Sequence, residues 1–357
     1  MINFEEYKEL GEPEKAEKSE IWQTAIGLQE VDGLKPSEYL LDAARQNIEG
    51  DITIFEVKEK LQTYYNEKPT LKSDEERVEE ADKVSAHIVE ILSEKAFVFS
   101  PAEYLSIHAR LFDGIYEHAG KIRGFNIAKN EWVLNNKTVT YASATNIMAT
   151  LDYDFLQEKG FNYKGLSKRQ MMEHVAQFIS NIWQIHAFEE GNTRATAVFA
   201  IKYLRTLGFA VNNDLFEKHS WFFRNALVRA NYTNYDLGVY STLKYLYNFF
   251  GNLLLGESNV LKNREMHILN EINNNELDTQ NEIVKNKNDT VKVKSNTVKD
   301  VLDLILEDKT ITAKKISELL GFSLATAKRR LQQLKDDGII IRVGSDKSGY
   351  WEVVKKD

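Results

Sequence analysis

Two apolar helical patterns, separated by a short polar run, dominate the middle of this sequence. Before the run, apolar residues fall at spacings of three and four, as on a helix packed on one side: Val175, Phe178, Ile182 and Ile185. After it, the same spacing recurs in a stretch that is apolar all round: Ala197, Ile201, Leu204 and Gly208. The second helix is therefore predicted to be central and buried, and to end at its glycine.

The polar run between them, HAFEEGNTR, covers residues 186–194. If the second helix starts near Asn192, its free N–H groups and helix dipole form an anion site. Arg194 adds a fork of donors suited to phosphate, and Glu190 offers oxygen to Mg²⁺, the usual companion of phosphates. His186 could take a proton near neutral pH.

The same residues also allow a purely structural interpretation. In that interpretation a helix ends at Gly191, Asn192 caps the next helix, and the charges are solvated. Short motifs often match by chance, so spacing alone does not exclude it.

The run resembles the signature of the Fic family, written H-x-F-x-[DE]-G-N-G-R-x-x-R. Most of its specified positions are matched in order, by His186, Phe188, Glu190, Gly191, Asn192 and Arg194. Two positions depart from it, because Thr193 replaces the third small residue and Ala197 replaces the second arginine.

This resemblance implies transfer of a nucleoside monophosphate, usually AMP from ATP, to a Ser, Thr or Tyr hydroxyl of a target protein. It implies that His186 deprotonates the hydroxyl and that Glu190 helps to hold Mg²⁺. The loop at 191–193 and the helix N-terminus would cradle the phosphate oxygens, and Arg194 would neutralise the outgoing phosphate. Such chemistry needs mainly positioning and charge neutralisation.

Composition limits the other functions open to this chain. With 357 residues it can form two or three domains, and with no cysteine it has neither disulfides nor a thiolate nucleophile. It shows no signal peptide and no apolar run long enough to cross a membrane, so we expect a cytoplasmic protein. A net charge of −8 argues against a general nucleic-acid binder, although residues 296–357 are slightly basic. A homodimer is among the assemblies that the sequence allows.

Composition and pattern divide the chain into four parts and predict a mainly α fold. These are an N-terminal helical region at 1–95, a Fic-like helical core at 96–256, a polar mobile linker at 257–296, and a winged helix-turn-helix domain at 297–357. Within the core, Asn135-Asn136 between the strand-like runs WVL and TVTYA predicts a β-hairpin. It occupies the place of the Fic flap, which holds the target by strand pairing.

The N-terminal region resembles the helices that precede the core in many larger Fic proteins. One of these helices often carries an inhibitory [ST]-x-x-x-E-[GN] segment, and Glu49-Gly50 is the nearest match. Arg45 stands where that segment has Ser or Thr, so a plain helix end at Gly50 is the alternative. Because Ala197 has no charge, we do not expect inhibition through a glutamate–arginine pair.

The last 60 or so residues show the order of a winged helix, which is three helices followed by two strands. One face of the third helix carries the candidate DNA-reading residues Thr326, Arg329, Arg330 and Gln333. Since the net positive charge is small, a protein-docking role is the alternative to DNA binding.

Three functional hypotheses follow. The first is a nucleotidyltransferase acting on a protein hydroxyl, which the intact His186 favours. The second is a transcriptional regulator whose Fic-like body senses a nucleotide without turning it over, which Thr193 and Ala197 favour. The third is the same transfer from a phosphate-containing donor other than ATP, because nothing in the motif reads a base.

Overall fold

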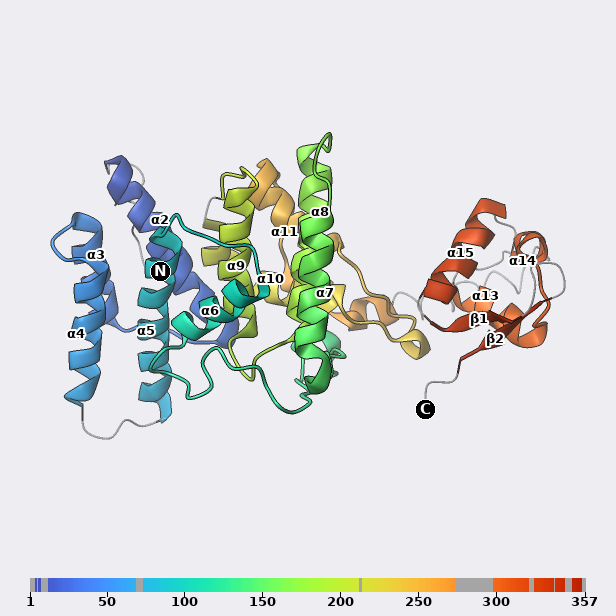
Figure 1. The fold of residues 1–357 in the computed structure, drawn as a ribbon, viewed down its shortest axis with the longest axis horizontal. Helices are drawn as coiled ribbons and strands as arrows, with labels where there is room; N and C mark the ends of the chain where they lie inside the picture. Colours follow the sequence, from blue (N-terminus) through green and yellow to red (C-terminus); the bar gives the residue numbers. More distant parts are fainter. Residues whose placement is uncertain are drawn as a thin grey trace. The chain divides into compact units, whose positions relative to one another are not determined.

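The computed structural model describes residues 4, 6–7, 12–68, 73–211, 214–273, 298–320, 324–336, 338–343 and 349–354. The chain separates into two compact units, Met1–Asn273 and Asn274–Asp357 (Figure 1).

The first unit is mainly α, as predicted. Its helices are α2 (Pro13–Gly27), α3 (Glu38–Glu49), α4 (Ile54–Asn66), α5 (Ser73–Ser93), α6 (Pro101–Leu111), α7 (Ile147–Gly160), α8 (Lys168–Ile185), α9 (Asn192–Thr206), α10 (Asp214–Ala230) and α11 (Lys244–Leu255). Short 3-10 turns join them at η1 (Leu28–Asp32), η2 (Trp132–Leu134), η3 (Ala144–Asn146), η4 (Tyr235–Leu237) and η5 (Asn263–Met266). Among the described helices, none combines the length and the apolar composition needed to cross a bilayer.

Local capping sets many of the helix boundaries. Ser37 and Thr53 each accept a hydrogen bond from the third backbone N–H of the helix that follows, as expected for N-caps. Ser100 and Ser167 do the same at α6 and α8. At the other end of α3, Gly50 adopts a left-handed φ of 90°, a conformation that glycine takes without strain.

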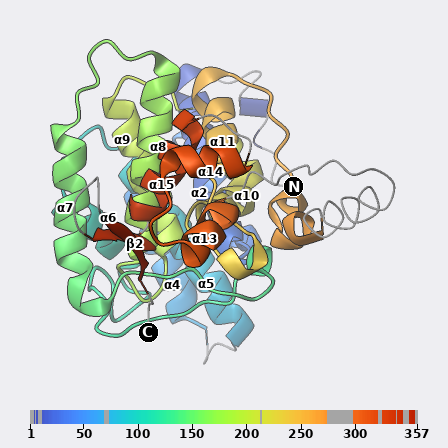
Figure 2. The same cartoon turned by 90° about the vertical axis from the view of Figure 1, so that its right-hand side faces the viewer.

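Helix α9 lies at the centre of the first unit. All of its side chains from Asn192 to Leu204 are buried, which confirms the predicted central helix. It packs against α5, α6, α8 and η1, and α7 covers α8 from outside (Figures 1 and 2). The start of α9 is therefore held by elements from both the N-terminal region and the core.

The predicted flap is a turn with little strand character. Asn135 and Asn136 adopt left-handed φ angles of 52° and 63°, as the Asn-Asn pair suggested. The turn is closed by one antiparallel bridge between Glu131 and Lys137, and Trp132–Leu134 form a 3-10 turn instead of a strand. Val133 and Leu134 are fully buried, so their side chains anchor this turn in the core of the first unit.

The predicted linker begins too early. Residues 257–273 pack on the helical body, because Met266 and Ile268 are buried and Glu271 forms an ion pair with the buried Arg229. The remainder of the predicted linker, up to residue 296, lies outside the described residues.

The second unit has the predicted winged-helix order. Helices α13 (Val298–Glu307), α14 (Ala313–Leu320) and α15 (Leu324–Asp336) precede the strands β1 (Ile340–Val343) and β2 (Tyr350–Val353), which pair antiparallel (Figure 1). Its own apolar core includes Val301, Ile305, Ile316, Leu331 and Leu334. The predicted turn between α14 and α15 lies outside the described residues.

Candidate active site

The loop between α8 and α9 is bounded by two residues with left-handed backbones. His186 is the C-cap of α8, with φ 50° and ψ 59°, and Gly191 is the N-cap of α9, with φ 74°. A Cβ atom on Gly191 would lie 2.2 Å from the Phe112 ring. The left-handed φ and this close contact both require glycine at the position. The start of α9 at Asn192 agrees with the sequence prediction.

Two of the predicted phosphate-binding side chains close the loop instead of facing a ligand. The Asn192 amide accepts a hydrogen bond from the Phe188 N–H at 3.0 Å and donates one to the Phe188 carbonyl at 2.8 Å. The Thr193 hydroxyl accepts a hydrogen bond from Trp183 Nε1 at 2.9 Å. Asn192 and Thr193 can still bind an anion through their backbone N–H groups, which belong to the first turn of α9.

His108 supports the loop from α6, a role that the sequence did not reveal. The Gly120 N–H donates to His108 Nδ1 at 2.9 Å, so the proton of the neutral ring lies on Nε2 and is donated to the Glu190 carbonyl at 3.0 Å. The ring stacks on Phe188 at 3.7 Å between centroids. Burial lowers the pKa of His108 to about 4, so this bonding pattern persists at neutral pH.

Arg123 supports the other end of the loop and was also missed. Its buried guanidinium donates to the His186 carbonyl at 2.7 Å and to the Phe125 and Ala142 carbonyls at 2.6 Å. These bonds join the end of α8 to the segments on either side of the flap. Only the folded chain brings these carbonyls together, and no local motif marks them.

His186 combines burial with unsatisfied ring nitrogens. The residue is only 3% exposed, and neither Nδ1 nor Nε2 has a hydrogen-bond partner among the described residues. The Tyr141 and Trp183 rings pack against it at 4.2 and 5.3 Å between centroids. Burial, together with the charge of Lys129, lowers the pKa of His186 well below 6.5. The imidazole is therefore neutral at pH 7 and available to accept a proton.

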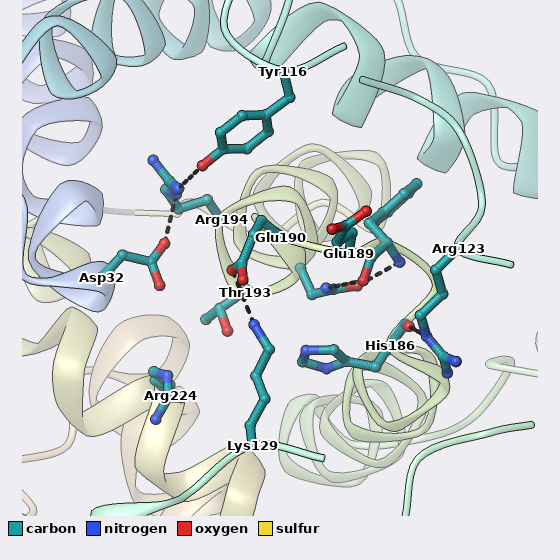
Figure 3. Close-up of polar contacts among 12 residues, drawn as sticks. Asp32, Tyr116, Arg123, Lys129, His186, Glu189, Glu190, Thr193, Arg194 and Arg224 are labelled. Atoms are coloured by element: carbon teal, nitrogen blue, oxygen red, sulfur yellow. Dashed lines mark hydrogen bonds and ion pairs between the residues drawn. The ribbon is translucent and has the colours of Figure 1, made fainter. Parts of the chain in front are cut away.

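Glu190 pairs with a lysine from the flap segment. Lys129 Nζ lies 3.0 Å from Glu190 Oε2, and the glutamate side chain is 52% exposed. Figure 3 shows the Lys129 ammonium and the His186 imidazole on the same side of the loop.

The residues around Glu190 can hold Mg²⁺ only if a bound ligand supplies further oxygen atoms to the ion. The described residues contain no cluster of three or more carboxylate or histidine side chains that could hold a metal by themselves. One exposed carboxylate, as at Glu190, is the usual protein contribution when phosphates supply further oxygens.

Arg194, predicted to neutralise the outgoing phosphate, is occupied by the protein itself. Its side chain is 1% exposed, and its Nε lies 2.9 Å from Asp32 while Nη2 lies 2.6 Å from Glu80. Nη1 donates to Gln29 at 3.1 Å, and the guanidinium also covers the Phe112 ring. Burial alone would lower the pKa of Arg194, but the two carboxylates raise it, so the charge is fixed. Figure 3 shows this side chain directed toward the N-terminal helices.

Glu49 does not meet the motif. It lies at the end of α3 and forms an ion pair with Lys15 at 2.7 Å, and this bond together with one from Tyr7 lowers its pKa. Ala197 is fully buried within α9. The carboxylates that reach the motif arginine come instead from Asp32 and Glu80.

The candidate DNA-reading residues lie on α15 of the second unit. Arg329 and Gln333 are exposed, and Arg330 donates to Gln333 at 3.2 Å. The side chain of Thr326 lies outside the described residues.

Comparisons with known proteins agree with this architecture. Residues 98–204 match the model of the Fic/DOC family, and residues 294–341 match a winged helix-turn-helix DNA-binding model. A curated relative, the protein adenylyltransferase VbhT of Bartonella schoenbuchensis, is 26% identical over 131 residues. That match covers 37% of this chain and 26% of VbhT, or about a quarter of the relative's length.

Two solved structures illustrate the similarity in fold. A Fic family protein from Desulfovibrio desulfuricans G20 has a TM-score of 0.43 at 11% identity, over 99% of this chain and 91% of that one. BepC from Bartonella tribocorum, solved with bound AMPPNP, has a TM-score of 0.41 at 20% identity, over 51% and 87% of the two chains.

The chain thus combines a Fic/DOC domain with a winged helix-turn-helix domain, which confirms the family resemblance.

Gly191→Ala is expected to lower the free energy of unfolding by roughly 2 kcal/mol or more, because it adds both a left-handed alanine and a clash. Gly208→Ala is the matched control, since Gly208 has a φ of 81° but no described residue lies within 4 Å of an added Cβ. The control should cost only about 1–2 kcal/mol. Urea unfolding measures both, and equal losses would contradict the close contact with Phe112.

Arg194→Gln is expected to lower the free energy of unfolding by about 3 kcal/mol, because it leaves two carboxylates without their buried partner. Arg169→Gln is the control: this arginine is half exposed and pairs with Glu173 and Glu257. Its loss should cost under about 1 kcal/mol in the same measurement. A small effect at Arg194, equal to that at Arg169, would show that the cluster is not structural.

Proposed function

We propose that this protein transfers a nucleoside monophosphate, with ATP as the leading donor, to a Ser, Thr or Tyr hydroxyl of a target protein. The observation that carries the proposal is His186, a buried, neutral imidazole just before the N-terminus of α9 that has no hydrogen-bond partner in the described part of the chain. The Fic/DOC match of residues 98–204 and the adenylyltransferase relative support the same reaction.

In the proposed reaction His186 takes the proton of the target hydroxyl as its oxygen attacks the α-phosphorus. The bond to the β-phosphate breaks, and pyrophosphate leaves with the electron pair. A bound phosphate adds negative charge beside the imidazole and so raises its pKa when a proton must be accepted. The N–H groups at the start of α9 bind phosphate oxygens.

Magnesium, held by Glu190 and the donor phosphates, would supply further neutralisation. Arg194 contributes indirectly, because its ion pairs with Asp32 and Glu80 fix the first turn of α9. It is therefore proposed as a positioning residue, in place of the direct phosphate contact that the sequence predicted.

A nucleotide-sensing regulator is the second candidate function. The occupied Arg194 and the uncharged Ala197 favour it, because both reduce the positive charge available for turnover. In that case the nucleotide would bind without transfer, and the winged helix would bind DNA in response.

His186→Ala is expected to lower transfer from labelled ATP to protein by about 10²–10⁴-fold while ATP still binds, because a general base acts in the transition state. In the parent protein, the acid limb of the pH–rate profile should lie below pH 6.5. The lowered pKa keeps the free imidazole neutral there, and activity falls only when the pH drops through that lower value. Transfer that survives the substitution would exclude His186 as the base, and ATP binding without transfer by the parent would favour the regulator.

The second unit is proposed to bind DNA through α15. Residues 297–357, produced alone, should bind duplex DNA, and the affinity should fall as salt rises, because bound lysine and arginine release counterions. Replacing Arg329, a candidate base-reading residue, by Gln should weaken specific binding by about 1–3 kcal/mol and relax the sequence specificity. Circular dichroism establishes that the fragment is folded, and a folded fragment without DNA affinity at low salt would favour protein docking.

A further inference from the structure

The cations around the α8–α9 loop differ in their capacity to take up a phosphate. Arg194 is paired with Asp32 and Glu80, and it is buried. Arg123 donates hydrogen bonds from its guanidinium to backbone carbonyls. Arg224 donates from both terminal nitrogens to the buried carboxylate of Glu131, at 2.6 and 3.1 Å.

Lys129 differs from these three arginines. Its ammonium has three donors, and the side-chain partner found for it is one oxygen of Glu190 at 3.0 Å. Both side chains reach solvent, with 26% of the lysine and 52% of the glutamate exposed. Ion pairs of this kind are weak and exchange partners readily.

Lys129 lies close to the start of α9, where the sequence predicts a phosphate site. It pairs with the residue directly before the N-cap of α9, so its ammonium lies beside the positive end of that helix. It also acts on His186, whose pKa it lowers through its charge. Figure 3 shows the ammonium and the imidazole on the same side of the loop, and neither ring nitrogen of that imidazole has a hydrogen-bond partner among the described residues.

We propose that Lys129 is a phosphate-binding residue of this site, and that its pair with Glu190 exchanges for a phosphate oxygen when nucleotide binds. The proposal rests on the proposed function, because it assigns the cation that Arg194 and Ala197 do not supply. The exchange frees the Glu190 carboxylate, which can then accept Mg²⁺. Without metal, Glu190 competes with the phosphate for Lys129.

Calorimetric titration with ATP, in EDTA and separately in Mg²⁺, tests this exchange. In EDTA, Lys129→Gln should bind ATP about tenfold more weakly than the parent, the loss expected for one charge-assisted hydrogen bond. Lys129→Arg should retain most of the affinity. Lys137→Gln, which removes an exposed lysine of the same turn, is the matched control and should change affinity by less than about twofold.

Glu190→Gln gives the second, opposite signature. In EDTA it should bind ATP more tightly than the parent, because Lys129 is released from its partner, whereas the gain in affinity on adding Mg²⁺ should shrink. A purely structural glutamate would weaken binding under both conditions.

The outcomes separate this proposal from the proposed function. If the parent binds ATP and Lys129→Gln binds it equally well in EDTA, the assignment of Lys129 is wrong while the transferase proposal stands. If Glu190→Gln weakens binding without metal, the exchange is wrong. A parent protein that binds no ATP under either condition would overturn both proposals. Thermal melts of each variant exclude unfolding as the cause of lost binding.

Discussion

The buried charge of Arg194 is the interaction on which the rest of the site depends. This guanidinium, in the first turn of α9, is enclosed by the protein and needs two carboxylates to compensate its desolvation. Asp32 and Glu80 supply them from η1 and α5, so the N-terminal helices cannot move away from the loop without exposing unpaired charges. The N-terminal region is therefore part of the architecture of the site and not an appendage to it.

The loop that Arg194 anchors is held from every side except one. Asn192 closes it internally, His108 binds the Glu190 carbonyl, and Arg123 binds the carbonyl of His186. These groups are occupied and therefore position the backbone. The remaining face presents the imidazole, the backbone N–H groups of α9 and the Lys129–Glu190 pair. The backbone N–H donors are fixed by the helix, so they suit a phosphorylated ligand and need little reorganisation to bind one.

Short-range patterns were sufficient to predict the helices, the start of α9 at Asn192 and the order of the winged helix. They identified His186 and Glu190 as neighbours because both belong to one local motif. They failed where long-range packing decides, since no pattern connects Arg194 to Asp32 or Glu80, more than a hundred residues away in the chain. The local β-propensity of WVL did not predict its structure either, because propensity depends on context and these residues form a 3-10 turn whose Val133 and Leu134 pack into the core.

The position of the label in the donor tests the central claim most directly. The purified protein would be incubated in its native cell lysate with ATP labelled either at the α- or at the γ-phosphate, in the presence of Mg²⁺. Nucleotidyl transfer predicts that a protein band acquires the α-label and not the γ-label, because pyrophosphate leaves. Incorporation of the γ-label alone would indicate phosphoryl transfer, and incorporation of neither label would contradict an ATP-dependent transferase.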